Sequence, residues 1–389
     1  MRDGEMDLTI EQIPLGDKRL RRFVDVPWTL HRRDPHWTPP LRGELLGSRL
    51  FGLTGLLTPA HPYHRDAEVT HFIAHDGRTL LGRVSAAVNH RYNEYHGTRI
   101  GSFGFFDVCD DDRVTEGLLD GCRNWLAGRG METMRGPGGY SNATHEAHQG
   151  VLIEGFDAPP TVELTHNPPY YAEQLERYGL RKVKDYHAYR IELAPASGRL
   201  VRITSAVKRR RRIDTRPIDM RRLREEVNRI VEIYNEAWAA NWGFLPLADA
   251  EAEAIADSLR LVADPGLLRF ADVHGEPAAV LGALPDPNVP LRPRWNRFAD
   301  LDVIRAARLL LTRRRIPRIR LMFFGVRPRF RKMGIDAVLY SEVLEHALKH
   351  GYAMCEPSLL LEDNDLILRA STFMGGEHYK TWRIYEMAL

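Results

Sequence analysis

The stretch FFGVRPRFRKMGIDAVLY, residues 323–340, decides how this chain is interpreted. It runs from an apolar segment through a basic, proline-marked turn into a second apolar segment with helical spacing. Residues 318–326, RIRLMFFGV, predict the strand that enters the turn, and residues 336–350, DAVLYSEVLEHALKH, predict the helix that leaves it. The N-terminus of such a helix offers backbone N–H groups and a favourable dipole to an anion. The stretch therefore predicts a phosphate-binding loop.

The turn itself, RKMGID at residues 331–336, resembles the acyl-CoA loop of the GNAT acyltransferases, R/Q-x-x-G-x-G/A. Arg331, Met333 and Gly334 match this motif and are expected to bind the donor. Asp336 stands where the family has its second small residue. Its carboxylate is expected either to repel a pyrophosphate or to cap the helix itself.

The resemblance also implies a reaction and further donor-site residues. GNAT enzymes let an amine attack a thioester directly, so the protein supplies positioning, an N–H for the thioester oxygen and a base. The backbone at Phe324 and Val326 matches the place where the family polarises the acyl carbonyl, and Asn364 belongs to the expected donor site. Many relatives carry a tyrosine acid where this chain has Ser371, which leaves Tyr379, Tyr385 or water to protonate the thiolate.

Two residues are candidates for the general base. Glu356 interrupts an otherwise apolar predicted strand beside the central strand, and it is equally compatible with a structural carboxylate. His378 is the second candidate, because the ordinary pKa of histidine lies near neutral pH. A structural role for this histidine beside a closing strand is the competing interpretation.

The segment YNEAWAANWGF, residues 234–244, is the candidate wall of an acceptor pocket. Trp238 and Trp242 are four residues apart, which in a helix places them on one face, with Asn241 between them. A buried packing face is the alternative interpretation of the same spacing.

The chain also contains a weak internal repeat. Residues 71–90 and 268–288 each read as strand, glycine turn and strand, with turn glycines 198 positions apart. Residues 167–193 and 364–389 each read as helix, glycine and strand, with leading asparagines 197 apart. The alternative is two unrelated α/β halves. Spacing this constant favours one fold used twice.

The fold class predicted from these features is α/β of the α+β type. It consists of two tandem GNAT-like domains, each a mixed, mostly antiparallel sheet flanked by helices, as in a bacterial group of two-GNAT-domain proteins that the whole chain resembles. The expected boundaries are an N-terminal domain at 1–198, a basic linker at 199–216, and a C-terminal domain at 217–389 that holds the donor loop and active site. The first domain has a degenerate loop, because three aspartates (110–112) at its helix entry exclude a phosphate and suit N-capping.

Composition bounds the remaining possibilities. A chain of 389 residues predicts two domains, and a net charge of only +3 indicates no particular partner. Three scattered cysteines favour a reducing compartment, so we expect a cytoplasmic protein with no metal site. No apolar run of 18 residues is present, so no membrane partner is expected either.

The leading hypothesis is an N-acyltransferase that moves an acyl group from a phosphopantetheine thioester to the amine of a small molecule, as in secondary metabolism. No tightly bound cofactor is expected. An acyl carrier protein is favoured over acyl-CoA as donor, because Asp336 disfavours the pyrophosphate while Arg314, Arg327 and Arg329 form a basic rim for an acidic partner. One alternative hypothesis is that the donor is an aminoacyl-tRNA whose phosphates contact KRRRR (208–212). No other nucleic acid is expected as a partner. The other alternative is a non-catalytic binding module.

Overall fold

The computed structural model describes residues 7–143 and 145–389, and this part of the chain forms two compact units. The first unit comprises the described residues up to Tyr186 together with Leu291–Ala306 and Lys380–Leu389. The second comprises His187–Pro290 and Ala307–Tyr379. The end of the chain therefore belongs to the first unit.

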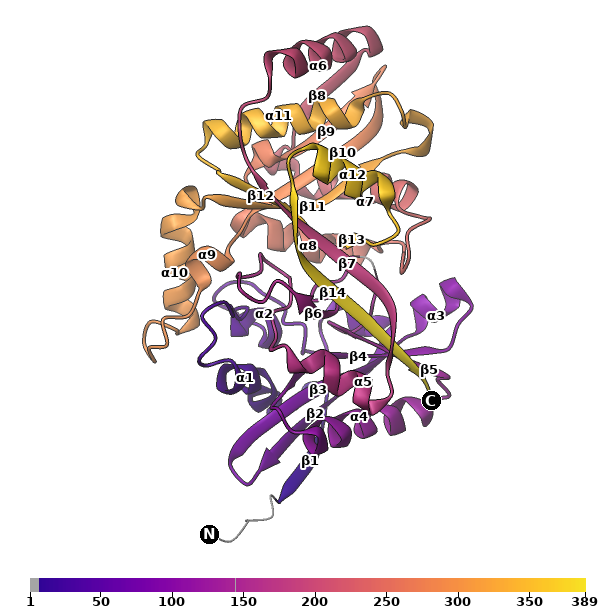
Figure 1. The fold of residues 1–389 in the computed structure, drawn as a ribbon, viewed down its shortest axis with the longest axis vertical. Helices are drawn as coiled ribbons and strands as arrows, with labels where there is room; N and C mark the ends of the chain where they lie inside the picture. Colours follow the sequence, from indigo (N-terminus) through magenta and orange to yellow (C-terminus); the bar gives the residue numbers. More distant parts are fainter. Residues whose placement is uncertain (1–6, 144) are drawn as a thin grey trace. The chain divides into compact units, whose positions relative to one another are not determined.

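The first unit is built on a mixed sheet with strand order β1-β2-β3-β4-β5-β14-β7, and β6 pairs with β14 (Figure 1). The pairs β1–β2, β2–β3, β3–β4 and β5–β14 are antiparallel, whereas β4 and β5 are parallel. Its elements are β1 (Leu8–Pro14), α1 (Leu20–Leu30), α2 (Arg42–Leu46), β2 (Ala67–Asp76), β3 (Thr79–Asn89), α3 (His90–His96), β4 (Ile100–Val108), α4 (Asp112–Ala127), β5 (Thr133–Gly138), β6 (Val151–Glu154) and α5 (Tyr170–Tyr178), with parts of β7 (Arg181–Glu192) and β14 (Glu377–Ala388).

Alternating side chains of this sheet feed two cores. Phe72 and Ala74 of β2 join the core that α4 and α5 cover, while Ile73 between them joins the core that α1 covers. Successive strand residues point to opposite faces, so one apolar strand serves both layers.

The second unit repeats this plan with strand order β7-β12-β11-β10-β9-β8. The pairs β8–β9, β9–β10, β10–β11 and β12–β7 are antiparallel, and β11 and β12 are parallel. Its further elements are α6 (Gly198–Arg211), β8 (Ile213–Pro217), α7 (Leu223–Ala237), α8 (Asp249–Val262), β9 (Leu268–Val273), β10 (Glu276–Pro285), α9 (Asn288–Leu291), β11 (Arg318–Val326), α11 (Ile335–Lys349), β12 (Met354–Pro357), β13 (Leu360–Leu361) and α12 (Asp365–Phe373). Helix α10 (Asp302–Thr312) begins in the first unit and ends in the second.

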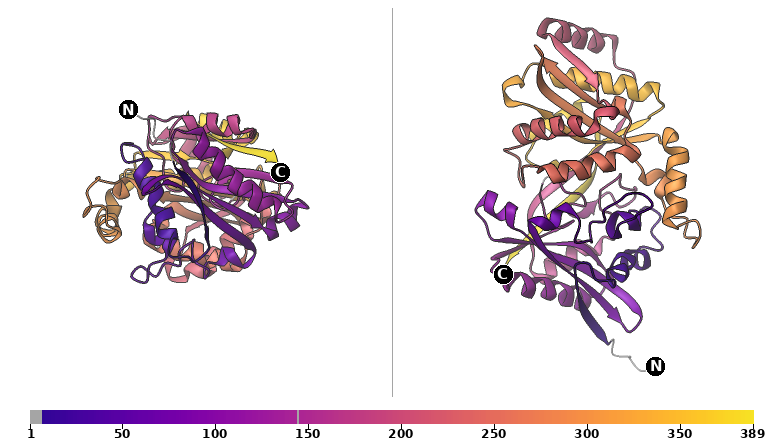
Figure 2. Two further views of the ribbon diagram at one scale, coloured as in Figure 1. Left: turned by 90° about the horizontal axis from the view of Figure 1, so that it is seen from below. Right: turned by 180° about the vertical axis from the view of Figure 1, so that it is seen from behind.

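Helices cover both faces of this second sheet. Leu281 of β10 packs in the core under α11, whereas the adjacent Val280 packs in the core under α7 and α8. Figure 1 shows α11 on the face of this sheet that is toward the viewer, and the rear view in Figure 2 shows α7 and α8 on the opposite face. The predicted fold, two mixed and mostly antiparallel sheets flanked by helices, is confirmed.

The repeat is also confirmed in detail. Both hairpins turn at a glycine with positive φ, Gly77 at 55° and Gly275 at 82°. Helices α5 and α12 are each followed by a positive-φ glycine and a long strand, as expected. Among the described residues, no helix is both long and apolar enough to cross a bilayer.

Residues 199–216, which the sequence suggested as a linker, are folded into α6 and β8. Strand β8 pairs with β9 along its whole length. The basic run suits the last turn of α6 because cations stabilise the negative end of the helix dipole. The domain boundaries proposed from the sequence stay a prediction.

One buried pair in the first unit predicts a pH dependence of stability. The His71 imidazole is fully buried, 3.3 Å from the Ile13 carbonyl through Nδ1 and 2.6 Å from Tyr140 Oη through Nε2. Burial lowers the pKa of His71 to about 3. Between its ordinary pKa and this value the unfolded chain binds more protons than the folded chain, so stability falls as the pH falls.

We expect His71→Gln to remove this dependence, because glutamine keeps polar partners but does not titrate. The free energy of unfolding of the wild type should lose about 2 kcal/mol more than that of the variant between pH 7 and pH 5. Urea denaturation at both pH values measures the difference. Equal losses in the two proteins would contradict the assignment.

Candidate active site

The central feature of the second unit is the point where two parallel strands part. Strands β11 and β12 pair from Arg318 with Met354 as far as Leu321 with Pro357, where β12 ends. Strand β11 continues to Val326, held along its other edge by β10. The last residues of β11 therefore present backbone toward a region where β12 no longer pairs with them.

Phe324 lies in this extension and contacts two aromatic residues. Its carbonyl oxygen accepts a hydrogen bond from Trp238 Nε1 at 2.9 Å. Its ring lies 5.2 Å from the ring of Tyr340, on α11. Trp238, predicted for the acceptor pocket, is thus brought directly to the predicted donor strand.

The loop that follows supports the start of α11. Arg331 Nη2 donates to the carbonyl of Ala237 at 2.8 Å, where α7 ends, and Arg331 Nε lies 3.4 Å from the Val326 carbonyl. Met333 packs against the core of the second unit. Gly334 adopts φ of 77° at the N-cap of α11 and provides no side-chain cap. Because glycine has no side chain, Gly334 does not occupy the first backbone N–H groups of α11.

The corresponding place in the first unit has opposite chemistry. Asp111 caps α4 by accepting from the backbone N–H of Arg113 at 3.0 Å, which confirms the expected capping. The strands also close on each other there. A Cβ added at Gly104 of β4 would lie 2.0 Å from the Gly139 carbonyl oxygen. At this place the first unit therefore has neither an uncapped helix start nor room between the two strands.

Helix α6 lies against the donor loop of the second unit. A Cβ added at Gly334 would lie 3.1 Å from Val207 Cγ1. Lys208, next to Val207, forms an ion pair with Glu342 of α11. Part of the basic run proposed for tRNA binding is thus used within the unit, while residues 209–212 are exposed.

The predicted base Glu356 is fully buried near the end of β12. Its Oε2 accepts a hydrogen bond from Tyr379 Oη. Burial and the charge of Glu356 raise the pKa of Tyr379 well above its ordinary value, so the phenol stays protonated. Arg320 is the register partner of Glu356 in β11 and donates from Nε to Ser358 Oγ at 2.9 Å. The structure thus joins two of the three predicted catalytic residues.

His378 occupies a different position from Tyr379. It is exposed, and its Nε2 lies 3.1 Å from His187 Nδ1. Adjacent residues of a strand point to opposite faces, so His378 faces away from the side on which Tyr379 meets Glu356.

The helical argument for Trp238 and Trp242 is wrong. Helix α7 ends at Ala237, and Trp238 is its C-cap. A turn follows, in which the Asn241 backbone N–H donates to the Trp238 carbonyl at 2.8 Å. Trp242 is half-buried beyond this turn. The side-chain hydrogen bond of Trp238 to Phe324 places this residue at β11.

Two further residues lie on α12. Asn364, predicted to bind the donor, is the N-cap of this helix and lies with Oδ1 3.5 Å from the Ile367 backbone N–H. Ser371 is fully buried, and its hydroxyl has no hydrogen-bond partner in the part of the chain that the structure describes. A buried hydroxyl left unpaired is costly, which marks Ser371 as an unusual position.

The predicted carrier-protein arginines differ in availability. Arg327 is buried and lies 3.5 Å from both Glu232 and Glu236. Arg329 is exposed and forms an ion pair at 3.1 Å with an acidic residue of β10. Arg314 is exposed in the 3₁₀ turn that follows α10. Arg314 precedes β11 and Arg329 follows it, so these two exposed arginines lie at opposite ends of a nine-residue strand and the predicted single rim is not formed.

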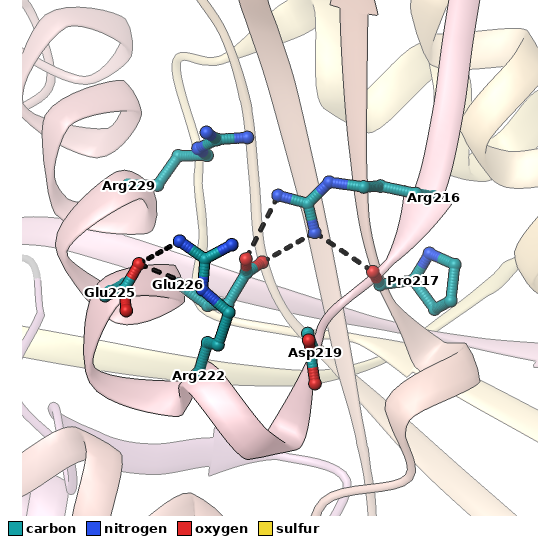
Figure 3. A pocket seen from close by; sticks show the side chains of 7 residues that line it. All are labelled: Arg216, Pro217, Asp219, Arg222, Glu225, Glu226 and Arg229. Atoms are coloured by element: carbon teal, nitrogen blue, oxygen red, sulfur yellow. Dashed lines mark hydrogen bonds and ion pairs between the residues drawn. The ribbon is translucent and has the colours of Figure 1, made fainter.

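A separate hollow lies between β8 and α7, and Figure 3 shows its lining. Arg216 forms two hydrogen bonds with Glu226, at 2.7 and 3.1 Å, and Arg222 pairs with Glu225. Because these charges neutralise each other and no predicted site residue lines the hollow, we do not assign it to the reaction.

Sequence reasoning missed Tyr340, Arg320 and Ser358. Tyr340 was identifiable in principle, because it follows Asp336 by four residues and so faces the same way as the loop end of α11. Burial and the charge of Asp336 raise the pKa of Tyr340. Arg320 depends on the pairing of β11 with β12, and no local pattern encodes that register.

Comparisons with known proteins agree with this architecture. No family model matches the sequence. The chain is 32% identical over 383 residues to the "Bacterial ceramide synthase" of Caulobacter vibrioides, covering 95% of each protein. It is 28% identical over 383 residues to "Protein YghO" of Escherichia coli strain K12, covering 96% of this chain and 93% of that one. A solved structure of a tandem GNAT protein from the clavulanic acid biosynthesis pathway matches 98% of both chains, with a TM-score of 0.57 and 12% identity, which supports the fold.

The fold and these relatives define a GNAT-type N-acyltransferase. The chain belongs to the tandem GNAT-fold N-acyltransferases, as the family resemblance of its loop predicted. It is an enzyme that acylates an amine with an acyl thioester cosubstrate, and a non-catalytic binding module is set aside.

Gly334→Ala tests the loop assignment, with Gly275→Ala as a matched control. Both glycines have φ near 80°, and each alanine should lower the free energy of unfolding by about 1–2 kcal/mol through left-handed strain. A Cβ at Gly275 meets nothing within 4 Å, whereas one at Gly334 enters the loop against Val207.

Only Gly334→Ala should weaken donor binding. Calorimetry with a thioester analogue measures the affinity, and urea denaturation measures stability. Equal donor affinities in the two folded variants would place the donor elsewhere.

Proposed function

We propose that this enzyme transfers a fatty acyl group from a phosphopantetheine thioester to the primary amine of a sphingoid-type base, forming a ceramide-like amide. The proposed acceptor is supported by the 32% identity, over nearly the whole of both chains, to a protein named bacterial ceramide synthase. A long-chain amino alcohol is a small-molecule amine of the kind that the sequence suggested.

The donor argument rests on the start of α11. Gly334 leaves the first turn without a side-chain cap, so backbone N–H groups are available for one phosphate. Asp336 lies exposed in that same first turn. Coenzyme A carries a pyrophosphate and a further phosphate, whereas a carrier protein presents a single phosphodiester on its pantetheine arm. A carboxylate at this position disfavours the more highly charged donor, so we favour an acyl carrier protein and a cytoplasmic reaction.

The proton chemistry is assigned to Glu356 and Tyr379. The amine nitrogen attacks the thioester carbonyl carbon, a C–N bond forms and the C–S bond breaks. The nitrogen loses one proton as the amide forms, and the leaving thiolate takes up that proton to become the thiol. Before attack the ammonium group loses a proton. Glu356 is fully buried, whereas Tyr379 is partly exposed and donates to it. Tyr379 accepts the substrate proton as it passes its own to Glu356, so the phenol stays neutral and the proton ends on the buried carboxylate of Glu356.

This assignment predicts the effects of Glu356→Gln and Tyr379→Phe. Loss of a general base typically lowers the rate 10²–10⁴-fold, so both variants should lower kcat by about that range with donor affinity unchanged. The loss should shrink at high pH, where more of the amine is already free. Steady-state kinetics across pH measure this, and His378→Gln is the control that should leave kcat nearly unchanged. A loss below about threefold for Glu356→Gln would return this residue to a structural role.

The donor preference predicts that Asp336→Gly improves coenzyme A binding. Two like charges 4 Å apart repel by about 4 kcal/mol at an effective dielectric of 20, and solvent lowers this. We therefore expect a gain on the order of 10- to 100-fold in acyl-CoA affinity, with little change for the acylated carrier protein. Arg329→Glu should weaken the carrier protein, mainly through its association rate and with marked salt dependence.

Calorimetry with both donors on the wild type and Asp336→Gly gives the result. Tight acyl-CoA binding by the wild type, not improved by glycine, would favour an ordinary acyl-CoA enzyme.

A further inference from the structure

Helix α10 exposes an apolar face to solvent. Its residues at positions i, i+1, i+4, i+7 and i+8 are all exposed and apolar, and we call them the α10 face: Val303, Ile304, Ala307, Leu310 and Leu311. The exposed fraction is 84% at Leu311 and about half at the three other large side chains. A helix of a soluble domain normally buries such a stripe, whereas α10 buries Arg305, Ala306 and Leu309 and leaves this stripe exposed.

Two polar side chains, Arg305 and Asp302, hold α10 to the first unit. Arg305 is fully buried and donates to three backbone carbonyls, those of Leu291 at 3.0 Å, Pro40 at 3.2 Å and Pro39 at 2.5 Å. Asp302 accepts from the Gly43 backbone N–H at 2.9 Å. A buried guanidinium deprived of these partners would be strongly unfavourable, so the helix cannot rotate to hide its apolar face.

Arginines flank the α10 face at both ends. Arg297 precedes it, and residues 313–315, three exposed arginines, follow it. Residues 292–315 contain eight arginines and two aspartates, a net charge of +6 where the whole chain has +3. Both aspartates accept hydrogen bonds from backbone N–H groups. Asp300 accepts from Arg294 and Asn296, and Asp302 accepts from Gly43. The surface is therefore apolar in its centre and cationic at its ends.

Phe298 and Leu301 extend the apolar surface toward the start of the helix, with exposed fractions of 64% and 53%. An apolar stripe bordered by arginines is the composition of helices that lie in the membrane interface, where long cationic side chains reach the headgroups. Anionic headgroups complement the net positive charge.

The dimensions of the face argue against a second copy of the chain. Eleven helical residues at 1.5 Å each span about 17 Å, and a helix is about 10 Å wide, which gives roughly 170 Å². A stable protein interface buries about 800 Å² on each partner. A bilayer needs no such matched area, because it accepts any apolar face at its surface.

We propose that α10 is an interfacial helix that binds the enzyme to the surface of an anionic membrane. The α10 face lies at the boundary between headgroups and acyl chains, and Arg297 and residues 313–315 contact the lipid phosphates. This inference does not rest on the proposed acceptor or donor, because it follows from the exposure, anchoring and charge of α10.

The test is co-sedimentation of the full chain with vesicles. We expect binding to vesicles of phosphatidylcholine with phosphatidylglycerol, at least tenfold weaker binding to phosphatidylcholine alone, and loss of most binding in high salt. The double variant Leu310→Glu/Leu311→Glu should lower partitioning into anionic vesicles at least tenfold. Arg314→Glu/Arg315→Glu should lower it mainly for the anionic vesicles.

Leu50→Glu is the matched control, because it places the same charge at an exposed leucine outside the α10 face. It should leave vesicle binding unchanged. Circular dichroism and thermal unfolding show whether each variant is folded, and both glutamates of the double variant replace side chains that are already exposed.

Three results would overturn the proposal. The first is no sedimentation of the wild type with anionic vesicles, and the second is equal sedimentation of the wild type and the double variant. The third is a partner of another class on this face: a dimer in light scattering, or binding of an acyl carrier protein, that the double variant abolishes while vesicles are not bound. Vesicle binding by an enzyme that fails to acylate a sphingoid base would overturn the proposed acceptor and leave this inference intact.

Discussion

The architecture of the site depends on how briefly β11 and β12 pair. Four residue pairs hold the two parallel strands together, and β10 then carries β11 five residues further without β12. Because backbone polar groups in such a region need partners or a ligand, the Trp238 indole N–H donates to the Phe324 carbonyl. The buried Glu356 lies near the end of β12 and accepts a hydrogen bond from the Tyr379 phenol. The same extension delivers the chain into the loop that starts α11. The Phe324 carbonyl that Trp238 contacts and the approach of the chain to the start of α11 thus both follow from the end of this pairing.

The two units show that this fold does not by itself provide a donor site. Strands β4 and β5 are parallel like β11 and β12, yet Gly104 brings their backbones so close that no Cβ fits between them. Helix α4 starts with Asp111 as its cap, whereas α11 starts with Gly334, which has no side chain. The Asp111 carboxylate accepts from the Arg113 backbone N–H, and its negative charge at this helix start disfavours an anion. The difference between the units therefore lies in a few residues at equivalent positions and not in the topology.

The sequence was sufficient where structure is determined locally and insufficient where it depends on distant contacts. The hairpin glycines and the helix–glycine–strand units were predictable, because positive φ and periodicity act within a few residues. The assignment of Lys380–Leu389 to the first unit was not, since an apolar alternating strand fits either sheet edge. The end of α7 at Ala237 was also hidden, because Arg331, nearly a hundred residues later, donates to that last carbonyl. The Glu356–Tyr379 contact was proposed only as two separate candidates, because their meeting requires two strands to be placed.

Helix α10 illustrates the same limit at the surface. Its period predicts an amphipathic helix, but period alone does not say which face is buried, and the usual assumption would have turned Leu310 and Leu311 inward. Arg305 decides the matter, because three backbone carbonyls of the first unit meet its guanidinium and an apolar side chain there would leave them unpaired. For an enzyme whose proposed substrates are a fatty acyl chain and a long-chain base, this orientation has a physical purpose. Such a base partitions into bilayers, since each buried methylene contributes about 0.8 kcal/mol, so its concentration in water is very low. An enzyme bound at the membrane surface meets its acceptor in two dimensions, where the acceptor is concentrated, and still receives the thioester from the aqueous side.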